Sequence, residues 1–322
     1  MILSMKPPYD ITPKILKLIT SISEKLGEVN ANYLSKQSPQ LRKQNRIKTI
    51  HSSLQIEGNT LTEEQITALI ENKRIIGPQK DVLEVVNAIK VYEKLAAFKF
   101  NSDKSFLQAH HSLMNGLIDS AGKYRTKGVG IVKGNKVEHL APPAENVPFL
   151  MKDLFKYLND SEELTLIKSC VFHYEMEFIH PFLDGNGRMG RLWQTLILLS
   201  EYPVFEFLPF ETLISLTQEE YYKALSLSDK CGKSTIFIEY MLDVINKSLE
   251  NLLSYNQRIL KDVDRLEYFI TLGVKEFTRK DYMNTFKDLS SATASRDLKK
   301  GIDLQLFECI GKLNKTKYVV RK

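Results

Sequence analysis

The chain has 322 residues, of which 43% are hydrophobic and 26% are charged. This composition is that of a globular protein, and it excludes a collagenous, low-complexity or mostly disordered chain. At roughly 100 to 200 residues per domain the length predicts two or three domains. The formal net charge of +6 permits an anionic partner without requiring one.

Cysteine usage argues against a zinc- or disulfide-stabilised protein, and hydropathy argues against a membrane-spanning one. The three cysteines, Cys170, Cys231 and Cys309, lie far apart and lack the spacing of a zinc site or a disulfide framework. Charges interrupt every apolar stretch well before the roughly 18 residues of a membrane span, and the first ten residues have no signal-peptide pattern. We therefore expect a cytoplasmic protein without a membrane partner.

Helical spacing dominates the first hundred residues. Apolar residues recur every three to four positions from Ile11 to Leu26 and predict a helix, and a second helix is expected over about 41–58. Thr62 and Gln65 have the spacing of a capping box that begins the next helix. Two more periodic stretches follow at 83–97 and 106–117.

The pattern changes between residues 122 and 143, where β-branched residues alternate around Lys133-Gly134-Asn135 and predict a β-hairpin. Helical periodicity then returns. Pro203 and Pro209 indicate a linker-like bend. The helices expected on the two sides of this bend cover 147–158, 164–179 and 188–199, and then 217–227 and 236–258.

The last segment, 259–322, has its own organisation. A helix to Leu272, a short helix over 279–286, a third helix from about 290 and two strand-like runs follow one another. That order is typical of a winged helix-turn-helix domain. The sequence thus predicts a mainly α protein with an N-terminal helical region (1–100), a helical core that carries the hairpin (101–258), and this C-terminal domain.

The stretch from His180 to Arg191 carries the clearest chemistry. Glycines flank Asn186, so the backbone there can turn its N–H groups inward around an anion. An apolar helical pattern follows, which places a helix N-terminus at the same point. Arg188 lies one helical turn before Arg191, and the two side chains could bind further phosphate oxygens.

Two more residues complete this pattern. Asp184 is an oxygen ligand suited to Mg²⁺, and a neutral His180 could take a proton from an attacking hydroxyl. Taken singly, such a histidine more often packs in a core, and two arginines on a helix are usually a solvated face. Their joint occurrence within twelve residues favours phosphate chemistry.

The same stretch resembles the signature of the Fic family, His-x-Phe-x-Asp/Glu-Gly-Asn-Gly-Arg-x-x-Arg, and matches it at every defined position. The resemblance extends upstream through 172–179 and to Gly122-Lys123-Tyr124-Arg125. The whole arrangement is similar to a bacterial Fic subgroup with an N-terminal inhibitory helix, a Fic helical core with a hairpin flap, and a C-terminal winged helix.

The resemblance implies a nucleotidyltransferase that moves AMP from its co-substrate ATP to a Tyr, Ser or Thr hydroxyl of a protein, the chain itself included. It implies His180 as the catalytic base and Asp184 as the ligand of Mg²⁺. The ATP-binding residues that it implies are Gly185, Asn186, Gly187, Arg188, Met189, Gly190 and Arg191, with Tyr221, Tyr222 and Asp229 at the adenosine end.

Two of these assignments leave alternatives open. Relatives often carry Asn where this chain has Asp229, and Tyr221 and Tyr222 could equally be core residues. Some relatives move phosphate or another nucleotide-derived group, although the intact Gly-Asn-Gly-Arg loop favours AMP.

The resemblance makes the hairpin a target-docking flap formed by Val129, Gly130, Ile131 and Val132. An exposed strand edge can add a strand of a target protein by main-chain hydrogen bonds. The alternative is an ordinary surface hairpin.

Residues 51–59 resemble the inhibitory helix of Fic proteins, Ser/Thr-x-x-x-Glu-Gly/Asn, with Ser53 and Glu57 at the matching positions. We expect the Glu57 carboxylate to pair with Arg191 and to occupy the space of the γ-phosphate. The alternative is a solvated charge at a helix end. In relatives this glutamate is sometimes implicated in AMP removal, which the sequence does not decide.

A competing hypothesis makes the protein a DNA-binding transcriptional regulator. Basic residues outnumber acidic ones after residue 260, and Arg296, Lys299 and Lys300 could contact bases and phosphates. A winged helix can equally dock a protein or form a homodimer.

Overall fold

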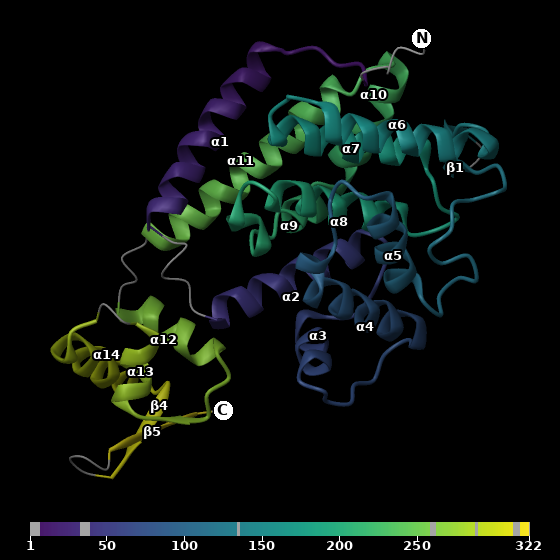
Figure 1. Cartoon of the computed structure of the whole chain (residues 1–322). Helices are drawn as coiled ribbons and strands as arrows, with labels where there is room; N and C mark the ends of the chain where they lie inside the picture. Colours follow the sequence, from purple (N-terminus) through teal and green to yellow (C-terminus); the bar gives the residue numbers. More distant parts are fainter. Residues whose placement is uncertain are drawn as a thin grey trace. The chain divides into compact units, whose positions relative to one another are not determined.

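The computed structural model describes residues 7–32, 39–133, 136–257, 262–286, 289–311 and 316–321. The chain forms two compact units, unit 1 (Met1–Leu252) and unit 2 (Leu253–Lys322) (Figure 1). Helices make up most of the described residues. The predicted mainly α class is therefore confirmed.

Unit 1 is a helical assembly with one hairpin. Its helices in chain order are α1 (Pro13–Asn32), α2 (Pro39–Ile56), α3 (Glu63–Ile70), α4 (Gln79–Glu93), α5 (Asp103–Met114), α6 (Val147–Asp160), α7 (Thr165–Ile179), α8 (Asn186–Leu199), α9 (Glu211–Leu216), α10 (Gln218–Cys231) and α11 (Thr235–Gln257), the last of which crosses the unit boundary. Single 3₁₀ turns cover Leu95–Ala97, Ala144–Asn146 and Pro203–Glu206, and the strands are β1 (Gly130–Lys133) and β2 (Lys136–Leu140).

Helix α8 lies at the centre of unit 1 and packs along α7 (Figure 1). Nearly all of its side chains are buried, which is the pattern of a helix surrounded by others rather than of an amphipathic surface helix. Aromatic rings fill the space around it: Phe106 contacts Trp193 and Phe182 with ring centroids 5.0 and 5.3 Å apart. The residues that start α8 are therefore held by a rigid core.

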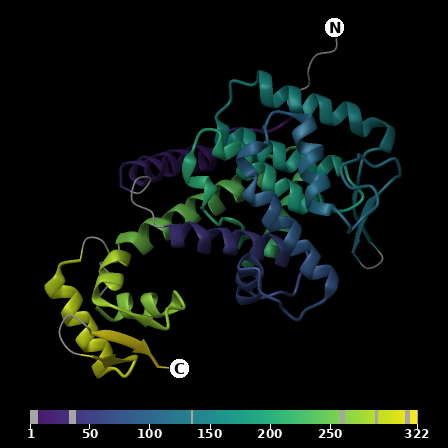
Figure 2. The ribbon, with the colours of Figure 1, turned by 60° about the horizontal axis from the view of Figure 1, so that its bottom comes forward.

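The first helix covers α11, with which it runs side by side in two views (Figures 1 and 2). Ile15 and Ile22 are fully buried, as their helical spacing predicts. Polar pairs join the two ends of the contact, with Thr12 Oγ1 donating to Glu239 Oε1 at 2.6 Å and Lys25 Nζ donating to Asn246 Oδ1 at 3.1 Å.

The capping box predicted at the start of the third helix is present in α3. Gln65 N donates to Thr62 Oγ1, and Thr62 N donates to the Gln65 side chain. By contrast, the linker-like bend expected near Pro203 is wrong. Pro203 begins a 3₁₀ turn, α9 follows, and Phe205 and Phe210 are buried in the core. Apolar residues between the two prolines anchor this segment, and the prolines only shape its turns.

The hairpin pairs β1 and β2 antiparallel, with Gly130 opposite Leu140 and Lys133 opposite Lys136. The register shifts between Ile131 and Val132. Two residues of the expected turn, 134–135, lie outside the described residues.

Unit 2 combines three helices, α12 (Asp262–Thr271), α13 (Arg279–Thr285) and α14 (Ser291–Asp303), with strands β3 (Glu276–Phe277), β4 (Phe307–Ile310) and β5 (Lys317–Val320). The strands form one antiparallel sheet in the order β3-β5-β4. The two-residue strand β3 was not anticipated, and the expected basic turn at 312–315 lies outside the described residues.

The core of unit 2 is its own. Buried apolar side chains from all three helices and the sheet meet there: Leu266, Phe269, Phe277, Tyr282, Ala294, Leu298 and Phe307. Arg265 binds the buried Asp297 through two nitrogens, at 2.7 and 2.9 Å. None of the helices in the described parts of the chain is long and apolar enough to cross a bilayer.

Candidate functional site

The site is built on the loop between α7 and α8. Helix α7 ends at His180, which adopts the left-handed conformation (φ 50°, ψ 60°) that costs an ordinary residue roughly 1 to 2 kcal/mol. Gly185 is also left-handed (φ 87°) and stands at the N-cap of α8. Asn186 closes the loop, since its side chain accepts from Phe182 N and donates to Phe182 O, both at 2.9 Å. Its amide therefore holds the loop in shape.

His110 on α5 supports this loop, although no sequence pattern points to it. Its ring stacks on Phe182, with centroids 3.5 Å apart and planes 4° from parallel. Gly122 N donates to Nδ1 at 2.8 Å, so the proton lies on Nε2, which donates to Asp184 O at 3.0 Å. Burial lowers the pKa of His110 to about 4, and the ring stays neutral at physiological pH.

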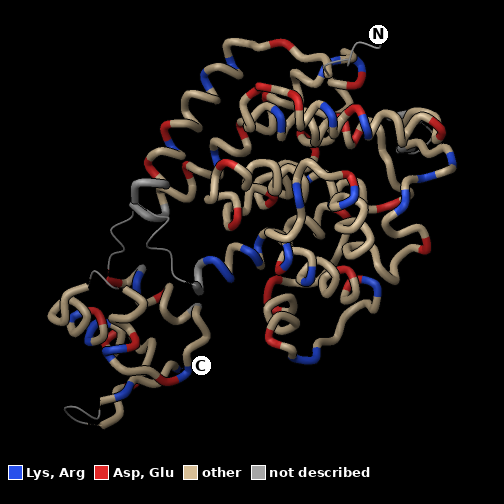
Figure 3. The backbone as a smooth tube through the Cα atoms, in the orientation of Figure 1, with Lys and Arg blue, Asp and Glu red and all other residues tan. Residues whose placement is uncertain are grey.

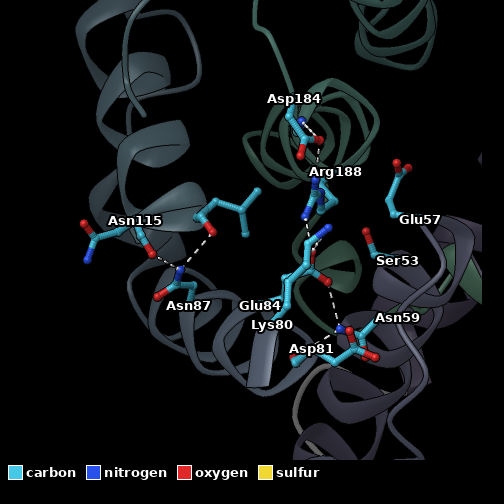
Figure 4. Close-up of polar contacts among 12 residues, drawn as sticks. Ser53, Glu57, Asn59, Lys80, Asp81, Glu84, Asn87, Asn115, Asp184 and Arg188 are labelled. Atoms are coloured by element: carbon cyan, nitrogen blue, oxygen red, sulfur yellow. Dashed lines mark hydrogen bonds and ion pairs between the residues drawn. The ribbon is translucent and has the colours of Figure 1, made fainter. Parts of the chain in front are cut away.

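Arg188 is held between two carboxylates (Figure 4). Its Nη1 donates to Glu84 Oε1 on α4 at 3.1 Å, and its Nη2 donates to Asp184 Oδ1 at 2.7 Å. Glu84 is 6% exposed and also accepts from Asn59 Nδ2 at 2.8 Å. In this arrangement Arg188 orients the Asp184 carboxylate. Glu84 was missed because α4 lies about a hundred residues before the motif in the chain.

Asp184 is the residue that could hold a metal ion. Its side chain is 45% exposed, and Oδ1 takes the hydrogen bonds of Arg188 and Gly185 N. The described residues contain no group of three or more acidic, histidine or cysteine side chains suited to a metal. A single open carboxylate fits Mg²⁺, which proteins commonly bind through one or two carboxylates together with substrate phosphates.

Arg191 is fully buried and faces α2. Its Nη2 donates to Glu57 Oε1 at 2.8 Å and to Ser53 O at 2.8 Å, and its Nε donates to Ser53 Oγ at 3.1 Å. Burial alone would lower the pKa of Arg191, but the Glu57 carboxylate raises it above its ordinary value. Nη1 is buried and has no hydrogen-bond partner among the described residues. That N–H group remains available for an anion.

The Glu57 carboxylate lies on the first turn of α8. A Cβ atom added to Gly187 would collide with Glu57 Oε1, so the absence of a side chain at 187 lets the carboxylate approach. Figure 4 shows Ser53 on α2 and Glu57, which directly follows α2, on one side of Arg188. The free N–H groups and partial positive charge of a helix N-terminus favour an anion at this point.

The remaining residues of the motif at 180–191 lie deeper in the core of unit 1. Met189 is fully buried, and a Cβ on Gly190 would collide with the His173 ring. Of the residues expected at the adenosine end, Tyr221 is 1% exposed and its hydroxyl lies 3.0 Å from His173 Nε2. Tyr221 is therefore part of the core that supports α8.

Tyr222 and Asp229 lie nearer the surface on α10. Tyr222 is 44% exposed, and Asp229 accepts a hydrogen bond from Tyr174 at 2.9 Å. Burial, together with the charge of Asp229, raises the pKa of Glu175 to about 7. Val129 and Gly130, at the start of the hairpin, follow a segment in which Arg125 contacts the loop between α7 and α8.

Comparisons with known proteins identify a family and several structures that are similar to this chain. A model of the Fic/DOC family matches residues 100–198. The crystal structure of a Fic family protein from Desulfovibrio desulfuricans G20 is similar over 98% of this chain and 98% of its own, at 40% sequence identity and a TM-score of 0.76. Fic-1 from Caenorhabditis elegans shares the fold over 76% of this chain and 73% of its own, with 22% identity and a TM-score of 0.64.

Two curated proteins are similar in sequence. Protein adenylyltransferase fic-1 of Caenorhabditis elegans is 27% identical over 254 residues, which are 74% of this chain and 47% of that protein. Protein adenylyltransferase Fic of Drosophila melanogaster is 28% identical over 214 residues, which are 62% of this chain and 41% of that protein. The chain thus spans about half the length of these relatives, or less.

Proposed function

The chain belongs to the Fic family, and from this premise we propose that it is a protein adenylyltransferase. It transfers AMP from ATP to the hydroxyl of a Tyr, Ser or Thr side chain in a protein, with pyrophosphate as the leaving group. The names of the curated relatives support this activity. The observation that carries it is the buried Arg191, whose Nη1 has no hydrogen-bond partner among the described residues and lies beside the first turn of α8.

In this reaction His180 is the general base. It takes the proton of the target hydroxyl while that oxygen attacks the α-phosphorus, and the bond from the α-phosphorus to the oxygen of the β-phosphate breaks. The N–H groups at the start of α8 stabilise negative charge that develops on the phosphate. Arg191 binds the terminal phosphates through Nη1 and, once Glu57 has moved, through Nη2.

Asp184 would hold Mg²⁺, with Arg188 and Glu84 fixing its carboxylate. When bound, the ion neutralises phosphate charge and so assists departure of pyrophosphate. The side chain of Asn186 acts through the loop, whose shape it maintains, and His110 supports the same loop from behind.

Glu57 inhibits this activity in our proposal. Its carboxylate takes the hydrogen bond of Arg191 Nη2 and lies against Gly187, where the γ-phosphate of productively bound ATP would need both the space and the positive charge. Like charges repel and one guanidinium N–H cannot serve two anions fully, so ATP binds unproductively until Glu57 withdraws.

The position of the transferred label tests the reaction. The Glu57→Gly variant is incubated with Mg²⁺ and a cell lysate, with ATP labelled either at the α-phosphate or at the γ-phosphate. Because kinases of the lysate use γ-labelled ATP, both labels are compared with a parallel reaction of His180→Ala/Glu57→Gly. We expect protein labelling above this reference from α-labelled ATP only. Labelling above the reference from γ-labelled ATP would instead show phosphate transfer by this protein, and mass spectrometry would identify the modified hydroxyls.

A second candidate function, duplex DNA binding by unit 2, is favoured by the exposed face of α14. Ser295, Arg296 and Lys299 are exposed there, whereas the acidic Asp297 of the same helix is buried against Arg265. Both charge signs are interspersed along the rest of the unit (Figure 3). Binding to a DNA duplex should weaken steeply with salt, since neutralised phosphates release counterions. No binding at low salt would discard this function.

A further inference from the structure

Arg125 is a buried arginine between α5 and β1 that joins two parts of the site. It is 2% exposed, and among the described residues no carboxylate forms an ion pair with it. Its donors go instead to main-chain carbonyl oxygens. Burying a guanidinium without a carboxylate partner costs free energy. The function of Arg125 must therefore lie in the main-chain groups that its hydrogen bonds hold.

One group of bonds goes to the end of α7. Arg125 Nε donates to His180 O at 2.7 Å, Nη2 donates to Ile179 O at 3.2 Å, and Arg125 N donates to Pro181 O at 2.9 Å. These are consecutive carbonyls at a helix C-terminus, which lack partners within the helix and carry its negative end. They also lie on both sides of the left-handed backbone of His180, so Arg125 stabilises the conformation that aims the imidazole.

The other group of bonds goes to the two ends of the hairpin. Arg125 Nη1 donates to Lys127 O at 2.9 Å, just before β1, and Nη2 donates to Pro142 O at 2.6 Å, just after β2. A single planar guanidinium thus closes the base of the hairpin and attaches it to the helix that ends in His180. Lysine cannot replace this function, because one ammonium group lacks the fork of donors that reaches both sides.

We propose that Arg125 is a positioning residue that fixes the target-docking hairpin relative to His180, so that a hydroxyl presented by a strand added to β1 reaches the imidazole. This inference rests on the proposed function. It concerns the protein substrate and the base, because none of these bonds goes to the residues around Arg191.

The test compares Arg125→Lys with its parent in the Glu57→Gly background. We expect AMP transfer to protein to fall roughly 10- to 100-fold, since a shift of about 1 Å at a reacting group can cost that much. ATP affinity should stay within about twofold. Amide hydrogen exchange should rise in the segments 126–143 and 176–184 and remain unchanged in α1 and α11.

Arg265→Lys is the matched control, because it makes the same chemical change at another largely buried arginine, in unit 2, and should leave transfer unchanged. Equal transfer by Arg125→Lys and its parent would overturn the inference and leave the proposed function intact. Exchange that rises throughout unit 1 would also overturn it, since that result indicates only lost stability. If Glu57→Gly transfers no AMP, the proposed function fails, and the exchange pattern alone then decides whether Arg125 holds the hairpin.

Discussion

His180 is placed by its neighbours more than by its own preferences. Its left-handed backbone is unfavourable for a residue with a Cβ, and the carbonyls around it are fixed by Arg125. A strained residue that its surroundings stabilise is common at active sites. In the proposed function, this conformation holds the base next to the loop between α7 and α8.

Replacement of His180 by Ala should separate chemistry from binding. In the Glu57→Gly background we expect AMP transfer to fall about 10²- to 10⁴-fold, the usual contribution of a general base, whereas ATP affinity should change by less than about twofold. Labelling with α-labelled ATP and equilibrium nucleotide binding measure the two quantities. Transfer at the parent rate would show that another group takes the proton.

A buried carboxylate near Arg191 should make stability depend on pH. Glu211 is fully buried at the start of α9, and burial raises its pKa from 4.5 to about 7 although the charge of Arg191 lowers it. The folded state therefore binds this proton more tightly than the unfolded state. The stabilising effect of the proton is complete below about pH 4.5 and is lost as the pH rises through 7, at about 1.4 kcal/mol for each unit of pKa shift.

Glu211→Gln removes this ionisation and keeps the shape of the side chain. At pH 8 the variant should be more stable than the parent protein by roughly 3 kcal/mol, and the difference should shrink toward pH 5. Thermal unfolding of both proteins at the two pH values measures it. An equal difference at pH 5 and pH 8 would mean that Glu211 is not the titrating group.

At the scale of single residues, the sequence revealed the groups that are adjacent in the chain and missed those that are adjacent only in space. His180, Asp184 and Arg191 lie in one short motif, which the resemblance could identify. Glu84 and His110 reach the same loop from α4 and α5. A buried acid or histidine in a helix has no pattern of its own, so only the fold reveals such partners.

Helix α2 is the element that delivers Glu57, and its end is anchored on α4. Asn59 is 8% exposed, its Nδ2 donates to Glu84 Oε2 at 2.8 Å and to Asp81 O at 3.1 Å, and its Oδ1 accepts from Leu61 N. The same Glu84 binds Arg188. Helix α2, which leads into the proposed inhibitory residue Glu57, is thus linked through Glu84 and Arg188 to the carboxylate expected to hold the metal (Figure 4).

Asn59→Ala should loosen this anchor. It leaves Glu84 Oε2 without its amide donor, which costs about 1 to 3 kcal/mol of stability. We expect AMP labelling above that of the parent protein but below that of Glu57→Gly. Thr60→Ala is the control, because it removes only an exposed hydrogen bond to Asp81. Labelling unchanged by Asn59→Ala despite a lower melting temperature would show that the anchor does not restrain Glu57.

Most helices were predictable because their apolar residues recur at helical spacing, as at Ile15 and Ile22, or because they carry a cap, as at Thr62. The segment around Phe205 was not. Its two prolines interrupt any periodicity, and only packing of its aromatic residues against the core decides that it forms a turn and a short helix.

At the scale of the whole chain, we expect a substitution in one unit to leave the activity of the other unit unchanged. Each unit has its own core, and Arg296 lies on an exposed face of unit 2, whereas Glu57 lies in unit 1. If unit 2 binds DNA, Arg296→Ala should weaken DNA binding about 5- to 100-fold without changing AMP labelling, and Glu57→Gly should do the reverse. Loss of AMP labelling in Arg296→Ala would contradict this separation.

The division into units follows from where apolar residues gather, which the sequence indicates only in part. The change of pattern after residue 258 pointed to a separate C-terminal segment, and the buried Phe269, Phe277 and Phe307 form its core. The winged-helix interpretation and the assignment of 1–100 and 101–258 as separate regions stay predictions.

The measurement that tests the central claim most directly is AMP labelling by the parent protein and by Glu57→Gly, with α-labelled ATP and Mg²⁺ and with His180→Ala/Glu57→Gly as the blank. A charge-assisted contact worth about 1.5 to 3 kcal/mol corresponds to roughly a 10- to 100-fold change in the population that binds ATP productively. We predict that AMP labelling by Glu57→Gly exceeds that of the parent protein by this factor and that labelling does not increase in the blank. Equal labelling by the parent protein and Glu57→Gly would contradict the claim that the Glu57 carboxylate occupies the site of the nucleotide's terminal phosphate.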